Sequence, residues 1–366
     1  LLEWLGALTR WVHVLAAILW VGVSFLFMWM DTSCEPPRSP RDGDVAGEMW
    51  MVHSGGFYEV VKRRSLRQAE LPPNLHWFKW QSYTTWISGT FLLAVVYWLG
   101  GGALLVDSGS RLTQGAAVAV SAGSLVAAWL VYDAACRSPL ARRPWLLAGL
   151  LVLALAGAVF GFTRVFGARA AWLQTGALLG TIMTANVWRV IVPGQAKMLA
   201  QTRAGVPVDT APGLLAKRRS THNHYLTLPV LFMMLSQHFP SGYGHPLGWL
   251  VLLLMSTAGV VLKYVMNARG RSDWRAVTLG AASLLAAIVL TARPGAGARA
   301  SAARLHASVS DEQAFAIVER RCTTCHSQKP SNPSFPQPPA GVMLDQLDRL
   351  RAMAPRVQVR AVETKT

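Results

Sequence analysis

The chain has 366 residues, of which 52% are hydrophobic and 14% are charged, and its formal net charge is +17. Soluble domains usually contain about a quarter charged residues, so this composition excludes an ordinary soluble protein and indicates an integral membrane protein. Four cysteines are too few for a disulfide scaffold. The positive charge alone would also suit a nucleic-acid-binding protein, and the positions of the charges decide between the two classes.

Apolar stretches long enough, or nearly so, to cross a membrane occur eight times in the sequence, since a hydrocarbon layer needs about 20 residues of helix. They occupy residues 4–30, 77–99, 113–135, 145–167, 172–192, 224–240, 246–267 and 274–292. The first is too long for a signal peptide and lacks a small-residue cleavage site. The sixth is the weakest, because it is short and contains His224, Gln237 and His238. We expect an all-α, polytopic membrane bundle of about eight helices.

Basic residues are distributed unequally between the two sets of connections. Those after spans one, three, five and seven contain sixteen Lys and Arg residues, whereas those after spans two, four and six contain two. Because cytoplasmic loops carry the excess of Lys and Arg, the first set is predicted to be cytoplasmic and both termini are predicted to be periplasmic. This topology explains most of the net charge, so we expect a multi-pass protein in the lipid bilayer and no nucleic acid partner.

The chain is expected to contain two domains. Residues 1–292 form the membrane domain, whose cytoplasmic loop at 31–76 is long enough to be functional. Residues 293–309 are rich in Gly and Ala and are predicted to be a flexible linker. A small helical domain, 310–366, begins with Ser310 and Gln313 at capping-box spacing before an apolar helical face. The stretch KPSNPSFPQPP that follows is too rich in proline for a helix or a sheet.

The small domain contains the sequence CTTCH at residues 322–326. This is the C-x-x-C-H pattern of c-type haem attachment. Two thiols at this spacing, at the end of a helix, can each add to one vinyl group of the same haem, and the next residue then lies beneath the iron. We predict that Cys322 and Cys325 bind haem c covalently and that His326 is a ligand of its iron.

Other interpretations of this motif are weaker. A zinc site would need two further Cys or His nearby, and a redox dithiol would need a βαβ context; the sequence offers neither. Haem is attached on the outer side of the bacterial inner membrane, and the charge distribution assigns the tail to that side. Only Met343 and Met353 follow the motif as methionines, and neither lies in an obvious ligand loop. We therefore expect either a truncated cytochrome c domain that lacks its distal ligand or an unusual coordination of the haem iron.

Ionisable residues within predicted spans are costly and indicate function. His13 lies in the outer half of the first span, and Arg10 lies one turn closer to the surface. A histidine at this position suits a ligand of haem b iron, and the arginine suits a partner for a propionate. The alternative role of His13 is a packed side chain that is hydrogen-bonded to a neighbouring helix.

A second group of polar residues gathers towards the predicted cytoplasmic side. One helical face at the start of the second span is predicted to present His76, Lys79, Trp80 and Tyr83. Lys79 and the tryptophans would alternatively snorkel and anchor the helix at the interface.

The inner ends of the fifth and sixth spans add further candidates. Asn186 and Arg189 supply an amide and a fixed cation. In the sequence THNHY, His222 and His224 flank Asn223 and lie about 200° apart on a helix, so one face cannot present both histidines. Histidine, lysine, arginine and asparagine beside tryptophan walls suit a planar, anionic, hydrogen-bonding substrate.

Four segments resemble the membrane-bound urate hydroxylases, in which a urate-oxidase-type membrane domain precedes a cytochrome c domain. The segments are RWVHVLAAILWVG, VHSGGFYEVVKRR, HWFKWQSYTTWISG and THNHYLTLPVLF. The resemblance runs from the first span to the end of the chain, and the combination is specific. The family continues with a Thr-Met-Pro segment, whose methionine is a candidate distal haem ligand, whereas this sequence ends at VETKT.

The resemblance implies that urate is oxidised to 5-hydroxyisourate, with water as the oxygen source. Electrons would leave through haem c to a periplasmic or membrane acceptor of the respiratory chain, such as a cytochrome c or an oxidase. A histidine suits the role of base, and we expect it to be His222 or His224. Lys79 or Arg189 suits stabilisation of the substrate charge. The alternative function is an electron-transfer module from quinol to a periplasmic cytochrome, without urate chemistry.

Overall fold

The computed structural model describes residues 2–99, 104–106, 112–268, 270–292, 310–332 and 335–358. The chain divides into two compact units, Leu1–Leu290 and Thr291–Thr366. This division lies next to the expected end of the membrane domain at residue 292. The predicted linker at 293–309 lies outside the described residues.

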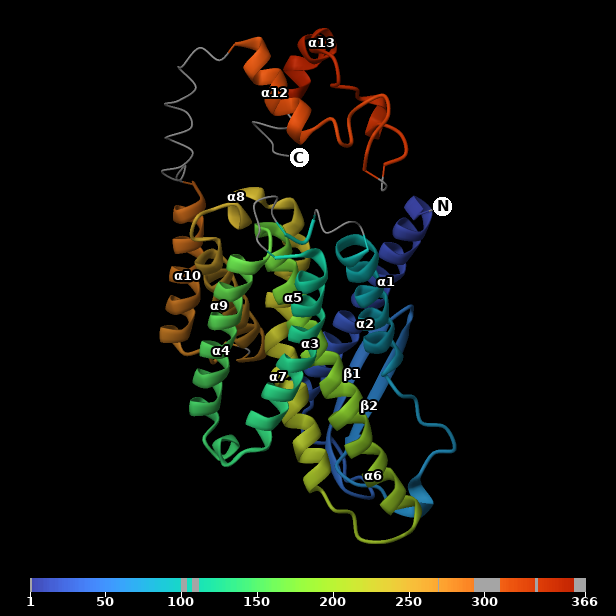
Figure 1. Ribbon diagram of the computed structural model, residues 1–366. Coiled ribbons are helices and arrows are strands. Elements are labelled where there is room, and N and C mark those ends of the chain that lie inside the picture. Colours follow the sequence, from blue (N-terminus) through green and yellow to red (C-terminus); the bar gives the residue numbers. More distant parts are fainter. Residues whose placement is uncertain are drawn as a thin grey trace. The chain divides into compact units, whose positions relative to one another are not determined.

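The first unit is a bundle of long helices with one β-hairpin (Figure 1). Its main helices are α1 (Leu2–Ser33), α2 (Trp80–Leu93), α3 (Gln114–Arg137), α4 (Pro144–Val165), α5 (Ala168–Asn186), α6 (Val192–Arg203), α7 (Ala211–Leu235), α9 (Gly248–Ala268) and α10 (Trp274–Ala292). Shorter helical turns are η1 (Gln68–Glu70), η3 (Pro139–Arg142), η5 (Ser236–His238) and α8 (Pro240–Tyr243). The bundle confirms the predicted helical membrane fold.

Six helical segments in the described part of the chain are long and apolar enough to cross a membrane. They are Trp4–Ser33, Gln114–Arg137, Pro144–Val165, Ala168–Arg203, Gly248–Ala268 and Trp274–Ala292. The other two predicted spans are also helical. However, α2 has only 14 residues before the π-helical turn η2 (Ala94–Trp98), and α7 begins at Ala211, so its first half is polar. The full count of eight crossings stays a prediction.

One helical segment runs without a break through three elements. Helix α5 ends at Asn186, the π-helical turn η4 (Val187–Ile191) follows directly, and α6 continues to Arg203. The whole segment, Ala168–Arg203, has 36 residues. At about 1.5 Å per residue it is about 54 Å long, which exceeds the ~30 Å thickness of a hydrocarbon layer.

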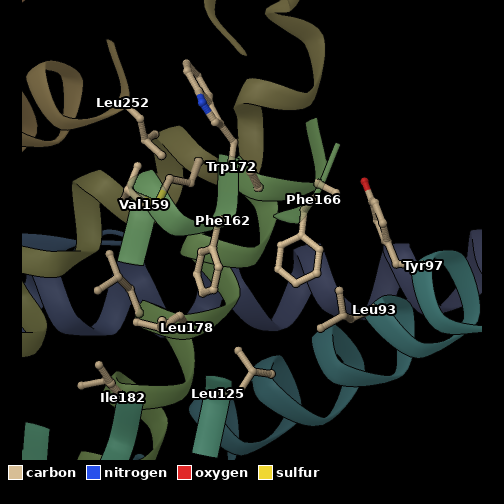
Figure 2. Packing of buried hydrophobic residues seen from close by; sticks show 14 of the residues in the cluster. Leu93, Tyr97, Leu125, Val159, Phe162, Phe166, Trp172, Leu178, Ile182 and Leu252 are labelled. Carbon is tan, nitrogen blue, oxygen red and sulfur yellow. The ribbon is translucent and has the colours of Figure 1, made fainter. Parts of the chain in front are cut away.

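A buried apolar cluster holds the bundle together (Figure 2). Trp172 of α5 has no exposed surface and packs edge-on or tilted against the rings of Phe232 and Tyr243. Phe162 of α4 and Leu252 of α9 belong to the same cluster. Large apolar side chains also cover the outside of several helices, which would be costly in water but suits contact with lipid.

The hairpin is an element that the sequence analysis did not predict. Strands β1 (Val45–His53) and β2 (Gly56–Arg63) pair antiparallel within the segment expected to be a loop at 31–76. Ser54 and Gly55 form the turn, with φ angles of 49° and 77°. The Ser-Gly-Gly turn between two apolar stretches was a signal for this hairpin.

A buried carboxylate at the hairpin binds two arginines of the segment that precedes β1. Glu48 of β1 is 3% exposed and accepts hydrogen bonds from the backbone N–H of Arg38 (3.0 Å) and from Nε of Arg41 (2.6 Å). The backbone bond to Arg38 and the ion pair with Arg41 hold the pKa of Glu48 below its ordinary value. The side chain of Glu48 therefore helps to fix the chain between α1 and β1, together with the backbone bridge between Glu35 and Glu48.

The second unit has helices α12 (Asp311–Arg321) and α13 (Leu347–Val357) and the 3₁₀ turn η6 (Pro339–Gly341). Ser310 and Gln313 form the expected capping box: Oγ of Ser310 accepts from the backbone of Gln313, whose side chain accepts from the backbone of Ser310. Leu344 and Leu350 are buried. Arg351 of α13 pairs with Asp311 of α12 at 2.6 Å, which ties the two helices together.

Candidate functional site

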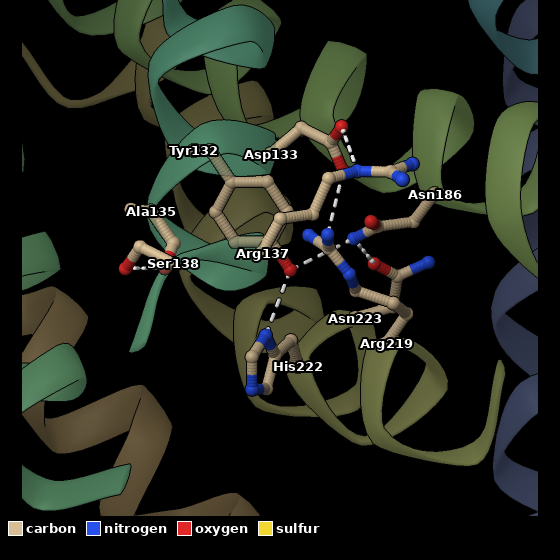
Figure 3. A network of polar contacts seen from close by, with 9 residues as sticks. All are labelled: Tyr132, Asp133, Ala135, Arg137, Ser138, Asn186, Arg219, His222 and Asn223. Carbon is tan, nitrogen blue, oxygen red and sulfur yellow. Dashed lines mark hydrogen bonds and ion pairs between the residues drawn. The ribbon is translucent and has the colours of Figure 1, made fainter. Parts of the chain in front are cut away.

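A network of polar side chains lies where the last turns of α3 and α5 meet the middle of α7 (Figure 3). Its members are Tyr132, Asp133, Arg137, Asn186, Arg219, His222 and Asn223. By the charge distribution, these turns are at the predicted cytoplasmic ends of their spans. Three helices that are distant in sequence therefore bring their polar residues to one place.

The hydroxyl of Tyr132 links α5 to α7. It accepts a hydrogen bond from Nδ2 of Asn186 at 3.1 Å and lies 2.7 Å from Nδ1 of His222. A hydroxyl oxygen has two lone pairs, so it can also accept a hydrogen bond from Nδ1–H of His222, which leaves Nε2 of the neutral imidazole unprotonated and able to take up a proton. Tyr132 thus orients the ring of His222, and the two rings also pack edge to face.

The two asparagines continue this network into the bundle. Nδ2 of Asn186 also donates to Oδ1 of Asn223 at 2.9 Å, and Nδ2 of Asn223 donates to the carbonyl of Met183 at 2.9 Å. Asn186 has no exposed surface, yet its Oδ1 atom has no hydrogen-bond donor among the described residues. A buried carbonyl oxygen without a partner is costly, so this atom is a candidate acceptor for an N–H group of a ligand.

Arg219 is the cation of the network. It is 0% exposed, its Nη2 atom pairs with Asp133 at 2.5 Å, and its guanidinium lies 4.9 Å from the centre of the Tyr132 ring. Asp133 also accepts a bond from Arg137 at 2.6 Å. Nε and Nη1 of Arg219 are buried and have no acceptor in the part of the chain that the structure describes. The site therefore offers unused N–H donors as well as an unused oxygen.

These atoms have the pattern that a flat, nitrogen-rich anion requires. Arginine binds planar anions through several N–H donors at once, and the free oxygen of Asn186 can accept from a ring N–H of the same ligand. His222 can take up a proton. The sequence analysis had selected Asn186, His222 and Asn223, and the structure brings these three together.

Arg189 does not join them. It was predicted to lie beside Asn186, but its side chain is exposed, whereas Asn186 is buried. The reason is the π-helical turn η4, which begins directly after Asn186. A π-helical turn is wider than an α-helical turn, so it rotates Arg189 away from the face that an unbroken α-helix would give it. Such turns are frequent at functional sites.

The predicted face of the second span is also only partly formed. Helix α2 begins at Trp80, so His76 precedes the helix and is exposed, where its ring contacts that of Phe78. Lys79 is the N-cap residue, and its ammonium lies 5.8 Å from the centre of the Trp80 ring. Trp80 contacts Tyr83. The prediction of one face shared by all four residues is wrong, because the helix starts later than the apolar pattern suggested.

His224 lies on another face of α7, as the angle between the two histidines predicted. Its Nε2 atom is 3.4 Å from the Ser220 hydroxyl, and its buried Nδ1 atom has no partner. It makes none of the contacts described for His222. The two candidate bases therefore belong to different surroundings.

His13 is a packed side chain that lies within hydrogen-bond distance of the neighbouring helix α2, which is the alternative role predicted for it. Its Nδ1 atom lies 2.9 Å from the carbonyl of Thr85 and 3.1 Å from the Ser88 hydroxyl, both on α2. Its ring packs on Gly89 so closely that a Cβ atom there would lie 2.8 Å from Cε1. Arg10 is exposed. A carbonyl bond to Nδ1 is one that metal-ligating histidines also make, so haem b at His13 stays a hypothesis.

The comparison with protein families now decides the relationship of the chain. The model of a family described as urate oxidase N-terminal matches residues 1–292. The chain belongs to the urate oxidase N-terminal family. The match spans the whole helical bundle, including every residue of the polar network. No curated protein and no solved structure matches the chain.

Three residues of the polar network in this member of the urate oxidase N-terminal family were not among the predicted site residues. They are Tyr132, Asp133 and Arg219. Arg219 was counted as a loop cation, because α7 begins well before the apolar stretch at residue 224. Asp133 carried a usable signal, since a carboxylate inside a predicted span is rarely without function. Tyr132 carried none, because tyrosine is common in membrane helices.

The residues of the haem motif, which lie outside the family match, fit a c-type haem. Helix α12 ends at Arg321, and Cys322 caps it. The backbone N–H groups of Cys325 and His326 both donate to the carbonyl of Cys322, at 3.1 and 2.7 Å. Nδ1 of His326 lies 3.1 Å from the carbonyl of Val342, which fixes the ring and leaves Nε2 for iron. Both cysteines are free thiols and half-buried.

Proposed function

We propose that the protein oxidises urate to 5-hydroxyisourate with water as the oxygen source. The observation that carries this proposal is the buried guanidinium of Arg219, whose Nε and Nη1 atoms have no acceptor, in the same network as the unused Oδ1 atom of Asn186. Urate is a planar anion with alternating C=O and N–H groups, so it can accept from Arg219 and donate to Asn186. Membership of the urate oxidase N-terminal family supports the same substrate.

The side chains of this network have distinct roles in the proposal. Arg219 binds the delocalised negative charge of urate and stabilises it as a proton is removed. Asn186, held by Asn223, fixes the orientation of the ring. His222, held by Tyr132, accepts a proton from the substrate or from the attacking water. Urate and one water yield 5-hydroxyisourate, two protons and two electrons.

Haem c, when bound through Cys322 and Cys325 with His326 on its iron, would accept the electrons that urate releases. The geometry of the motif supports attachment, because the turn at Cys322 and the bond from His326 to Val342 leave both thiols and Nε2 available. The charge distribution supports a bacterial inner-membrane protein with periplasmic termini. An acceptor of the respiratory chain would then take the electrons on the periplasmic side.

The direct test is anaerobic mixing of urate with the purified full chain while the haem absorption is followed. We expect urate to reduce the haem in the wild-type protein. Arg219→Gln should slow this reduction by at least tenfold, since one charged hydrogen bond contributes about 1.5–3 kcal/mol. Arg275→Gln is the control, because Arg275 is an exposed cation that stacks on Trp274 outside the network.

Two outcomes would overturn the proposal. The first is a wild-type protein with intact haem that urate does not reduce, particularly if a quinol does reduce it, which would favour a pure electron-transfer module. The second is equal reduction rates in the Arg219→Gln, Arg275→Gln and wild-type proteins, which would overturn the part of the proposal that assigns this network as the urate site.

A further inference from the structure

A second buried cation lies in a cavity between the last turns of α1 and α9. The cavity has a volume of about 360 Å³. It is lined by Phe25, Leu26, Met28, Trp29, Thr32, Lys263, Met266 and Asn267. None of these residues belongs to the polar network of Figure 3. Because the lining comes from the C-terminal turns of both helices, α1 and α9 end on the same side of the bundle.

Lys263 lacks a counter-charge in the part of the chain that the structure describes. It is 2% exposed, and its ammonium lies 3.5 Å from the centre of the Phe25 ring. No described carboxylate lies within 4.0 Å of it; the nearby Asp31 instead pairs with Lys62. A buried ammonium without an anion is costly, and one cation–π contact offsets only part of that cost. An anion bound in the cavity would offset the rest of that cost.

The walls of the cavity show what kind of molecule carries that anion. Leu26, Trp29 and Met266 are large apolar residues with 47%, 45% and 47% of their surface exposed, so the apolar wall continues onto the outside of the bundle. Thr32 and Asn267, nearer the helix ends, are the polar members of the lining. A molecule with an anionic head group and an apolar tail matches a cavity that has polar residues near the helix ends and an apolar wall beside them. A free inorganic anion would leave that apolar wall uncovered.

We propose that this cavity binds the phosphate group of an anionic phospholipid, with Lys263 as its counter-ion. The acyl chains would lie along the exposed apolar side of α1 and α9, and Asn267 would donate to a phosphate oxygen. Lysine binds phosphate as a point charge, and basic pockets between membrane helices are typical sites for anionic head groups. The proposal is independent of the urate chemistry, because no residue is shared.

The experiment measures lipid binding to the full chain in detergent by native mass spectrometry and by thermal unfolding. The probes are phosphatidylglycerol and phosphatidylcholine with identical acyl chains, and inorganic phosphate at the same concentration. We expect the wild type to retain phosphatidylglycerol and to unfold at a higher temperature with it than with phosphatidylcholine. Lys263→Met should reduce the preference about fivefold, the effect of roughly 1 kcal/mol per basic residue, and Lys263→Arg should keep it.

A second pair of variants keeps the test decisive if Lys263→Met does not fold. Asn267→Asp places a carboxylate at the half-exposed rim and should weaken the preference by a similar factor, whereas Asn267→Gln should not. The control outside the cavity is Arg275→Gln, since Arg275 is an exposed cation that stacks on Trp274. An unchanged preference in Lys263→Met, or in Asn267→Asp if Lys263→Met does not fold, would overturn the proposal. Equal stabilisation by inorganic phosphate would overturn it as well, because the source of the anion would not be lipid.

Discussion

The hydroxyl of Tyr132 and Nδ1 of His222 are 2.7 Å apart, although 90 positions of sequence separate the two residues. The bond joins α3 to α7 at the place where the buried Arg219 stacks beside the same tyrosine ring. One side chain thus positions both the candidate base and the candidate anion-binding group. In the urate chemistry proposed above, Tyr132 is therefore a positioning residue.

Replacement of Tyr132 by phenylalanine should lower kcat/KM for urate about tenfold. The variant removes the acceptor for Asn186 and the contact with His222, and one hydrogen bond contributes about 0.5–1.5 kcal/mol. Tyr97→Phe is a matched control: Tyr97 is 6% exposed, close to the 5% of Tyr132, and its hydroxyl donates to Gln237 at 3.2 Å in a separate network. Steady-state measurement of kcat/KM for urate compares the Tyr132→Phe and Tyr97→Phe variants. Equal loss in both variants would mean that Tyr132 acts only through stability.

The two neighbouring histidines should differ in their effect on catalysis. His222→Gln should slow urate-dependent haem reduction by about a hundredfold or more, the usual contribution of a general base. His224→Gln should have a much smaller effect on the chemical step, because His224 faces Ser220 and not the network. Stopped-flow single turnovers at saturating urate measure that step alone. The reverse ranking would move the base to His224.

Haem attachment should depend on both thiols of the motif. Cys322→Ser and Cys325→Ser should each leave at most one thioether, and the double variant should carry no haem that survives denaturing electrophoresis. Cys136→Ser is the control, since Cys136 is a buried cysteine of the bundle. A pyridine haemochrome spectrum of the wild type also tests His13: a c-type signal alone would contradict haem b there. Retention of covalent haem in the double variant would refute the attachment site.

Helix α1 should be held against α2 by the contact between His13 and Gly89. A Cβ atom at residue 89 would lie 2.8 Å from Cε1 of His13, so Gly89→Ala should destabilise the bundle by about 1–3 kcal/mol through overpacking. Gly22→Ala is the control, because nothing lies within 4 Å of a Cβ atom there. The second change His13→Ala should restore part of the stability. Thermal unfolding in detergent measures all three, and an unaffected Gly89→Ala would disprove the close contact.

The segment before the hairpin should loosen in acid through Glu48. The pKa of Glu48 is lowered in the folded protein from its ordinary value of 4.5, first by the backbone N–H of Arg38. The contribution of Glu48 to the stability of the folded protein is therefore complete above about pH 4.5. This contribution is lost as the pH falls through the lower pKa that Glu48 has in the folded protein. Hydrogen exchange at residues 34–48, corrected for intrinsic rates, should rise in that window. Glu48→Gln should show raised exchange already at neutral pH and little further change in acid.

The sequence predicted the helices well because their apolar stretches match the thickness of a membrane. It also pointed to Asn186, His222 and Asn223, which the structure joins in one hydrogen-bonded network, since polar residues near the ends of spans are few. It could not predict that Arg219 is buried, because the apolar run of α7 begins after it. Nor could it predict the π-helical turn that removes Arg189 from the site, since no residue pattern marks where a helix gains an extra residue in one turn.

The long helix Ala168–Arg203 has one consequence for the parts of the protein outside the bilayer. Its last carbonyl groups reach Gln68, whose side-chain amide donates to the carbonyl of Arg203 at 2.9 Å. Asn186 lies 17 residues earlier on the same rod, about 26 Å away. One helical segment therefore connects the part of the chain after the hairpin with the asparagine of the polar network, and its π-helical turn and Pro193 are the positions at which it can bend. A spectroscopic label near Gln68 would test whether the addition of urate changes the surroundings of the far end of this segment.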